Sequence, residues 1–324
     1  MENNAPVSLP LPFKSRVGND HINLNGGHAN CDPHPDFLCV GAQKGGTSWL
    51  YYQLSWHADF WMPPVKELHY FDALSKVKRG SPPRCKDARD QCFLQKMTAL
   101  GTQSHIDLDA YSRLFESKGA LLSGDITPAY SMLSNEIIEQ IVVRFPNLKV
   151  IFLARDPVER AWSQLSMGVR LGNIGPFDAT DADAVIRNLL NPGVFLRSYP
   201  SQIVARWKRY VRPALFRIYF FDDLKKNPAD LRRSILLFLG ADPDKPSGRC
   251  TAEQNWDAGK EKLQLTDKVR SRVAQFFEQE LKACAEELGG PAKHWPARYG
   301  FSLLVLAVQL MDDLDIFFWV DWVA

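Results

Sequence analysis

Short runs of consecutive apolar residues recur along the chain, with turns and polar stretches between them. Such runs are typical of strands in a parallel sheet that is covered on both faces. Residues 150–154 are apolar throughout and predict a central strand. Four further strands are expected, at 37–40, 68–71, 120–124 and 216–221.

Apolar residues at helical spacing follow several of these runs. Residues 47–57 carry Trp49, Leu50 and Leu54 on one helical face. Ser134 is placed to cap a helix, and the buried face expected for that helix comprises Ile137, Ile138, Ile141 and Val142.

More helices are predicted from Pro157 onward, over residues 201–212 and 229–239, and through a long pattern across 269–281. Basic residues and prolines in 73–100 instead indicate a loop. Because strands and helices alternate, we expect an α/β fold: a single P-loop-like domain with a central parallel β-sheet flanked by helices.

The turn between the first strand and the first helix is rich in glycine around a single lysine. Its candidate binding residues are Gly41, Lys44, Gly45, Gly46, Thr47 and Ser48. Glycines let a ligand approach the backbone, and a helix start presents unpaired N–H groups with partial positive charge. The turn therefore predicts an anion cradle. It is not a Walker A loop, in which the lysine follows the last glycine.

Composition indicates that any anion site is local. The 324 residues include 45% hydrophobic and 23% charged residues, ordinary proportions for a globular protein. The formal net charge is only +2. No overall positive field therefore points to nucleic acid.

The two ends of the chain differ from the middle. Residues 1–35 form a polar, irregular arm, and its His28, Cys31 and His34 lack an evident fourth ligand, so no metal site is expected. Residues 301–324 mix apolar residues with aspartates and are too short and too charged to span a bilayer. We expect this tail to pack on the domain at 36–300 or at a homo-oligomer interface.

The absence of an apolar leader or a transmembrane segment in the sequence predicts a cytoplasmic protein with reduced thiols. Disulfides between Cys85 and Cys92 or between Cys250 and Cys284 remain alternatives, because an even cysteine count alone does not exclude them.

Two polar residues at the entrance to the 68–71 run are candidate general bases. Glu67 and His69 are two residues apart, so they would share one face of a strand. A carboxylate or an imidazole beside an anion cradle can accept a proton from a substrate. A surface ion pair with a packed histidine explains the same residues equally well.

A second anion site is predicted where the central strand ends. Arg155 follows that strand directly, and Ser163 lies two turns into the helix that begins near Pro157. Ligands of open parallel sheets bind off the carboxyl ends of the strands. The competing interpretation is a local ion pair of Arg155 with Asp156 or Glu159.

Taken in order, four stretches resemble the sulfotransferases that use 3′-phosphoadenosine 5′-phosphosulfate, especially the heparan-sulfate type and its bacterial relatives. The stretches are residues 41–48, 66–71, 155–163 and 259–270, and the resemblance covers roughly residues 36–300. It implies that Lys44 contacts the 5′-phosphosulfate and stabilises charge on the bridging oxygen. The same group would be bound by Gly45, Gly46, Thr47 and Ser48.

The resemblance also implies roles for later residues. Arg155 and Ser163 would hold the 3′-phosphate, and Lys260 and Lys262 lie in a loop that closes over it. Glu67 matches the catalytic base, with His69 as assistant or alternative. The chain departs from the family where Gly259-Lys-Glu-Lys-Leu replaces Gly-Arg-Lys-Tyr-Pro and Asp125-Ile-Thr-Pro replaces Glu-Lys-Thr-Pro.

The reaction implied is sulfuryl transfer to a hydroxyl or amine of a small-molecule or carbohydrate acceptor, with 3′-phosphoadenosine 5′-phosphate as product and no metal. Two other functions stay open: a P-loop nucleotide kinase or hydrolase, and a non-catalytic adenosine-phosphate-binding module. Arg155 at the end of the central strand argues against the kinase, which needs an acidic metal ligand there. The basic residues of 76–89 favour an acidic acceptor, whereas Trp56, Phe60 and Trp61 favour an aromatic one.

Overall fold

The computed structural model describes residues 33–72, 85–100, 105–248, 250–254 and 262–302. Most of the predicted arm at 1–35 and of the tail at 301–324 lies outside these residues. Lys260 also lies outside them, whereas Lys262 is described and exposed.

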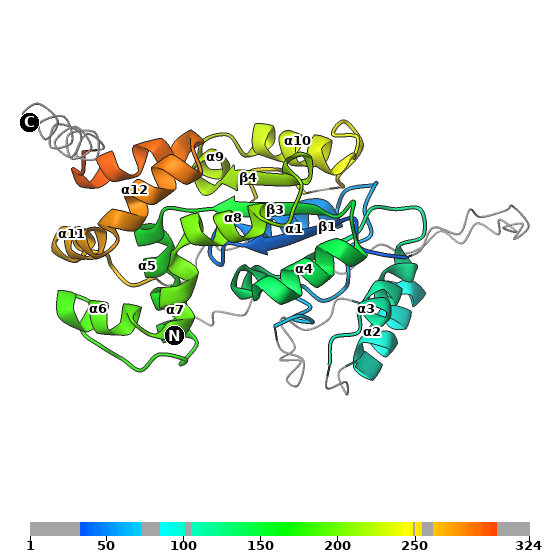
Figure 1. Cartoon of the computed structure of the whole chain (residues 1–324), viewed down its shortest axis with the longest axis horizontal. Coiled ribbons are helices and arrows are strands. Elements are labelled where there is room, and N and C mark those ends of the chain that lie inside the picture. The colour runs from blue at the N-terminus through cyan, green and yellow to red at the C-terminus, as the bar shows by residue number, and fades with distance from the viewer. Residues whose placement is uncertain (1–32, 73–84, 101–104, 249, 255–261, 303–324) are drawn as a thin grey trace, which may run out of the picture. The chain divides into compact units, whose positions relative to one another are not determined.

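A four-stranded parallel sheet forms the centre of the described structure (Figure 1). Its strands are β1 Phe37–Gly41, β2 Gly124–Ile126, β3 Lys149–Ala154 and β4 Phe216–Phe220. They lie in the order β2-β1-β3-β4, and each neighbouring pair is parallel. The 150–154 run is therefore an inner strand, as its apolar composition predicts.

Alternate residues of each strand enter two apolar layers, one on each face of the sheet. Phe37, Cys39, Ile151 and Leu153 pack with α1 (Thr47–Ser55) and α10 (Pro228–Leu239). Their neighbours Leu38, Val40, Val150 and Phe152 pack with α4 (Asn135–Arg144), α5 (Pro157–Arg170) and α8 (Pro200–Lys208). Both faces are therefore covered, and the predicted α/β fold is confirmed.

The remaining α-helices lie mainly around this core (Figure 1). They are α2 Ala88–Leu100, α3 Leu108–Arg113, α6 Ala182–Leu189, α7 Pro192–Phe195, α9 Phe221–Lys226, α11 Asp267–Phe276 and α12 Glu278–Glu287. Short 3₁₀ turns include η2 Pro128–Met132, η3 Leu196–Ser198, η5 Gly290–His294 and η6 Pro296–Tyr299.

Local signals set several boundaries as expected. The Ser134 side chain accepts a hydrogen bond from the Ile137 amide at the start of α4. Pro157 occupies the first turn of α5, which Asp156 caps. Gly240 ends α10 in a left-handed conformation.

Four predictions from local pattern are wrong. The strand expected at 120–124 instead spans Gly124–Ile126, so only Gly124 of the predicted range belongs to it. Residues 68–71 form no strand, because the backbone on either side of Leu68 turns through positive φ at Glu67 and His69. The predicted loop at 73–100 contains helix α2, whose Phe93 is buried in the core. The long pattern at 269–281 is two helices, α11 and α12, which meet at Phe277.

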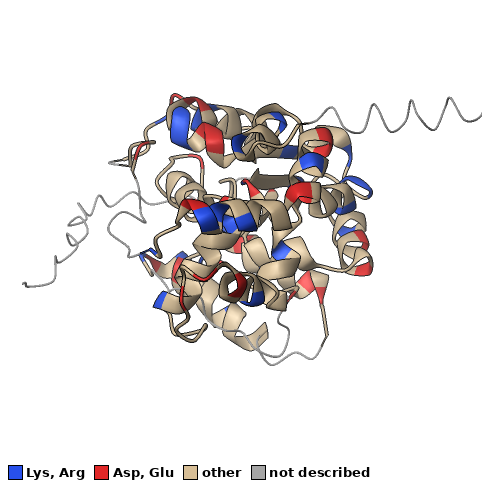
Figure 2. Ribbon diagram, turned by 90° about the vertical axis from the view of Figure 1, so that its left-hand side faces the viewer, with Lys and Arg blue, Asp and Glu red and all other residues tan. Residues whose placement is uncertain are grey.

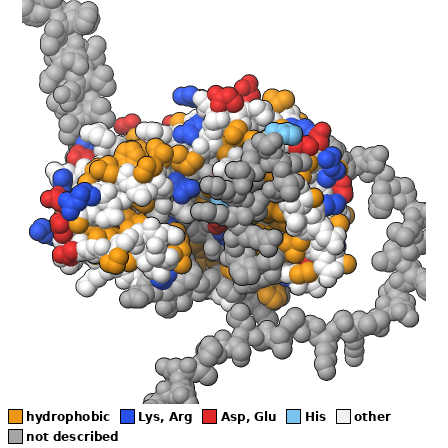
Figure 3. Space-filling view, turned by 90° about the horizontal axis from the view of Figure 1, so that it is seen from below, with side chains coloured by type: hydrophobic (Ala, Val, Ile, Leu, Met, Phe, Trp, Pro, Cys, Tyr) orange, Lys and Arg blue, Asp and Glu red, His pale blue; other side chains and the backbone are white. Residues whose placement is uncertain are grey.

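Charges of both signs are interspersed over the fold (Figure 2). Figure 3 shows the molecule from below, with hydrophobic side chains gathered at its left. Helices α6 and α7 lie on this same side in Figure 1. The exposed Leu190 and Leu196 belong to this part of the chain. Among the described residues, no helix combines the length and apolarity needed to cross a membrane.

All five described cysteines are free. Neither the Cys85–Cys92 nor the Cys250–Cys284 disulfide is therefore formed. Cys39 and Cys284 lie in the core, where burial raises the pKa of each thiol, to about 12 for Cys39.

Candidate active site

The glycine-rich turn is shaped by close packing against the neighbouring strand. A Cβ atom on Gly45 would come within 2.3 Å of the Leu153 carbonyl oxygen, so no other residue fits there. Gly46 has φ 103° and serves as the N-cap of α1 without any side-chain hydrogen bond to the first turn. Packing within the protein therefore requires glycine at Gly45, and the first amides of α1 have no side-chain cap. An uncapped helix start of this kind is what the predicted anion cradle needs.

The side chains of the cradle differ in exposure. Thr47 is buried, whereas Lys44 and Ser48 are half-buried. Lys44 has φ 69°, a left-handed conformation that is uncommon outside glycine. Its Nζ lies 3.8 Å from the sulfur of Met167 on α5, so the ammonium group points across the turn toward that helix.

Arg155 is in direct contact with the cradle. Its guanidinium NH1 donates to the Lys44 carbonyl oxygen at 2.8 Å, and its plane covers the Phe221 ring with 4.4 Å between Cζ and the ring centroid. The tertiary structure therefore joins the two anion sites that the sequence predicts separately. The competing ion pair with Glu159 also exists, at 3.6 Å.

Helix α5 carries the other predicted phosphate-binding residue. Ser163 is half-buried and lies two helical turns after Arg155. Its neighbour Trp162 donates from Nε1 to the Leu263 carbonyl at 3.0 Å, which fixes the segment next to Lys262 against α5. Two widely separated parts of the chain therefore meet at this helix.

Glu67 and His69 are close together despite the absence of a strand. His69 lies between two carboxylates, with Nδ1 2.9 Å from Asp72 Oδ2 and Nε2 3.5 Å from Glu67 Oε2. Lys66 pairs with the other oxygen of Glu67. Glu67 and His69 both have positive φ, at 67° and 54°, which is a strained backbone for such residues.

These contacts change the proton affinity of both candidate bases. The hydrogen bonds to Asp72 and Glu67 raise the pKa of His69 to about 9. Burial disfavours the charged form of Glu67, but His69 and Lys66 outweigh it and lower its pKa to about 2. At neutral pH Glu67 is therefore a carboxylate and His69 an imidazolium.

Asp125, at the middle of β2, anchors the segment that carries Glu67. Its carboxylate accepts hydrogen bonds from Thr127 and Tyr130 at 2.6 Å each and from Tyr111 at 3.2 Å. The Leu68 amide also donates to it, and the Tyr70 amide donates to the Tyr130 hydroxyl. Burial raises the pKa of Asp125 to about 6. Glu67 is thereby held at the edge of the sheet where β1 leads into the cradle.

Sequence reasoning missed several of these supporting residues. Asp72 could have been suspected from its position three residues after His69. Asp125 was noticed only as a departure from the family motif, and its hydrogen-bonding role depends on tyrosines that the fold brings to it. Glu159 was considered only as a local partner of Arg155, whereas its Oε1 also accepts from Arg270 at 2.6 Å.

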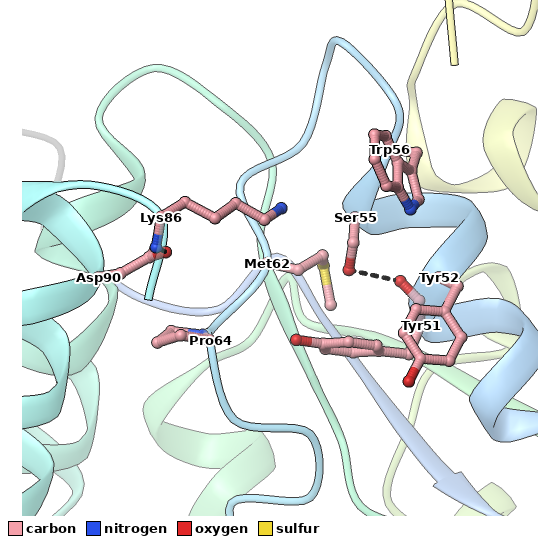
Figure 4. A pocket seen from close by; sticks show the side chains of 8 residues that line it. All are labelled: Tyr51, Tyr52, Ser55, Trp56, Met62, Pro64, Lys86 and Asp90. Carbon is pink, nitrogen blue, oxygen red and sulfur yellow. Dashed lines mark hydrogen bonds between the residues drawn. The ribbon is translucent and has the colours of Figure 1, made fainter. Parts of the chain in front are cut away.

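The aromatic acceptor site suggested by Trp56, Phe60 and Trp61 does not form as one cluster. Phe60 and Trp61 are buried core residues. Trp56 borders a cavity of about 40 Å³ at the C-terminal end of α1, the end opposite to the cradle (Figure 4). The cavity walls are formed by Tyr51, Tyr52, Ser55, Trp56, Met62, Pro64, Lys86 and Asp90. This volume suits about one water molecule rather than an acceptor.

The comparisons with known proteins agree with this geometry. A profile of the Sulfotransferase family matches residues 35–245, more than half of the chain. The chain belongs to the sulfotransferase family. The matched range includes the cradle, Glu67, Arg155 and Ser163, and it ends before Lys262.

Two curated sulfotransferases are similar over part of their length. The bifunctional heparan sulfate N-deacetylase/N-sulfotransferase of Drosophila melanogaster is 25% identical over 232 residues, 66% of this chain and 20% of the relative. The membrane-associated sulfotransferase kil1 of Dictyostelium discoideum is 28% identical over 136 residues, 42% of this chain and 23% of the relative. The chain thus spans about a fifth of the length of these relatives.

A solved sulfotransferase from Alicyclobacillus acidocaldarius has the same fold. It superposes with a TM-score of 0.58 at 22% identity, covering 81% of this chain and 98% of the solved chain. The resemblance inferred from sequence motifs is therefore confirmed at the level of family and fold.

Proposed function

We propose that this sulfotransferase transfers the sulfuryl group of 3′-phosphoadenosine 5′-phosphosulfate to a hydroxyl or amine of a small-molecule or carbohydrate acceptor. The observation that carries the proposal is the 2.8 Å hydrogen bond from Arg155 to the Lys44 carbonyl. It unites the cradle for the 5′-phosphosulfate with the arginine for the 3′-phosphate at the carboxyl edge of one sheet.

The residues fit a ligand with two anionic groups. The backbone at Gly45 and Gly46 leaves no room for side chains, and α1 begins without a side-chain cap. On the other side, Arg155 Nε is buried and finds no acceptor among the described residues. Lys44, Gly45, Gly46, Thr47 and Ser48 would hold the 5′ group, and Arg155 and Ser163 the 3′-phosphate, with Lys262 and the undescribed Lys260 nearby in sequence.

The nucleotide, when bound, supplies a sulfuryl group activated by its bond to phosphate. Lys44 and the first amides of α1 stabilise the negative charge that develops on the leaving oxygen. Thr47 and Ser48 add hydroxyl donors. Arg155 orients the ligand and braces the Lys44 backbone, which keeps the ammonium group aligned.

Glu67 accepts the proton of the acceptor hydroxyl. A carboxylate with a pKa of about 2 is a weak base. It suffices because the hydroxyl proton becomes steadily more acidic as the acceptor oxygen bonds to sulfur, so a weakly basic carboxylate accepts it as that bond forms. His69, held as an imidazolium by Asp72, keeps Glu67 ionised and oriented.

The first test is nucleotide binding measured by titration calorimetry without metal. We expect 3′-phosphoadenosine 5′-phosphate to bind more tightly than ATP with Mg²⁺. Arg155→Ala should weaken binding of the bisphosphate by about 10- to 100-fold, because a hydrogen-bonded charge is lost. Arg233→Ala is the matched control, since Arg233 is exposed and pairs with the exposed Asp244. Preference for ATP with Mg²⁺ would instead favour the kinase alternative.

The pH dependence separates the two candidate bases. If Glu67 is the base, kcat/KM should be nearly constant from pH 7 to pH 8.5, because a group with a pKa of about 2 is already ionised there and so is Asp125, whose pKa is about 6. If His69 is the base, it must first lose a proton with a pKa of about 9, and kcat/KM should rise about tenfold per pH unit up to that value. We expect the flat profile, measured with an acceptor that does not titrate in this range.

The acceptor class is proposed from the relatives and from the chemistry of the site. The heparan sulfate enzyme among the relatives supports a carbohydrate acceptor, and a carboxylate base suits any hydroxyl or amine that reaches Glu67. The cytoplasmic location stays a prediction from sequence, and one relative is membrane-associated.

A further inference from the structure

Three polar residues form a stripe along one side of the site. Arg155, Glu159 and Ser163 are spaced four residues apart across the start and first turns of α5, so their side chains follow one another on the same face. Two of them are assigned above to the 3′-phosphate. Glu159 lies between them and carries the same sign of charge as the ligand.

Glu159 is held by two arginines. Arg155 lies four residues before it, and Arg270 comes from a distant part of the chain. Its Oε2 lies 3.6 Å from Arg155 NH2, and its Oε1 accepts from Arg270 NH1 of α11 at 2.6 Å. The Glu159 side chain remains 30% exposed and that of Arg270 40%, so both can move without disturbing the core.

The charges at this place suit a phosphate better than a carboxylate. Two guanidinium groups surround a single carboxylate, which leaves one positive charge uncompensated within the trio. A phosphate monoester carries about −1.5 to −2 charges at pH 7, and a guanidinium fork matches its oxygens. Two further carboxylates, Asp156 and Asp222, also act on Arg155. They share Arg298 as an ion-pair partner, and Asp156 accepts a hydrogen bond from the Tyr299 hydroxyl at 2.9 Å.

Resting on the proposed function, we infer that Arg270 is a second arginine of the 3′-phosphate subsite, and that Glu159 holds Arg155 and Arg270 in place until the phosphate replaces its carboxylate. In the free protein Glu159 keeps the two cations from repelling each other. The 3′-phosphate of a nucleotide would form new ion pairs with the two arginines, and these replace the ion pairs that Glu159 loses. A nucleotide without this phosphate offers no such replacement. Arg270 would therefore contribute to selectivity for the 3′-phosphate rather than to binding of the nucleotide in general.

The test compares 3′-phosphoadenosine 5′-phosphate with adenosine 5′-phosphate by calorimetric titration. Arg270→Ala should weaken binding of the bisphosphate by about 10- to 100-fold and change binding of the monophosphate by less than about threefold. Arg272→Ala is the matched control on the same helix, because Arg272 is exposed and bonds Gln275 at 3.2 Å. It should leave both affinities unchanged.

A second variant tests the role assigned to Glu159. Glu159→Gln removes the competing charge but keeps the shape of the side chain, so the bisphosphate should bind about 3- to 10-fold more tightly while the monophosphate is unaffected. Weaker binding of the bisphosphate would show that Glu159 positions the arginines for the ligand, and would overturn the displacement.

The outcomes separate this inference from the function on which it rests. If the unaltered protein prefers the bisphosphate and loses that preference in Arg155→Ala but not in Arg270→Ala, the role of Arg270 is wrong and the proposed function stands. If Arg270→Ala weakens binding of both nucleotides equally, Arg270 has a structural role and does not recognise the 3′-phosphate. If the unaltered protein shows no preference for the bisphosphate, both proposals fail.

Discussion

Glu67→Gln is expected to lower kcat by about 10²- to 10⁴-fold, the usual contribution of a general base. The amide cannot accept the acceptor proton, although it has nearly the same shape as the carboxylate. Nucleotide affinity should change by less than about twofold, because Glu67 lies with Lys66 and His69 rather than in the glycine turn. Steady-state kinetics and calorimetric titration on the same preparation measure the two effects separately.

Glu116→Gln is the appropriate control for this variant. Glu116 also pairs with a lysine, Lys96, but it does so on an exposed surface. We expect its kcat to match that of the unaltered enzyme. An unchanged kcat in Glu67→Gln would show that Glu67 does not accept the proton. His69 would then be the candidate base, and kcat/KM should rise with pH instead of staying constant.

Lys44→Ala is expected to lower kcat by about 10²- to 10³-fold, similar to the loss of one donor to a developing oxyanion. Lys44 supplies a full charge at the turn, and its ammonium group points toward α5, which carries Ser163 and begins two residues after Arg155. Because charge on the leaving oxygen grows during transfer, the loss should appear mainly in kcat rather than in KM for the nucleotide.

Lys208→Ala provides the comparison for Lys44→Ala, since Lys208 is an exposed residue paired with Glu287. A variant of Lys44 with normal kcat and a raised KM would show that the lysine binds the nucleotide equally in the ground state and the transition state. Its assignment to the leaving oxygen would then be wrong.

The fold was largely predictable, because the relevant signals are local. The alternation of apolar strands with helical spacing predicts two covered faces, and capping residues such as Ser134 and Gly240 mark helix ends within a few residues. The failed strand at residues 68–71 has a tertiary cause. At Glu67 and His69 the tertiary contacts impose a backbone that these residues disfavour locally, so a periodicity argument could not detect it.

The candidate site was predicted as separate pieces. The glycine turn and Arg155 each have a local signature, but their hydrogen bond joins residues more than a hundred positions apart in the chain. The raised pKa of His69 follows first from Asp72, at 2.9 Å from the imidazole, and the lowered pKa of Glu67 follows from His69 and Lys66. Spacing identifies which groups can titrate, whereas their pKa values depend on distances that exist only in the folded protein.

Residue types and their spacing were enough to predict the α/β class, the glycine-rich turn and the family, because each depends on a short segment of the chain. The tertiary structure alone decided which of these segments meet, how Asp125 anchors Glu67, and that Arg270 reaches Glu159 on α5. The physical reason is that hydrogen bonds and ion pairs act over a few ångströms of space, and only packing of the two apolar layers on the sheet brings distant parts of the chain within that range.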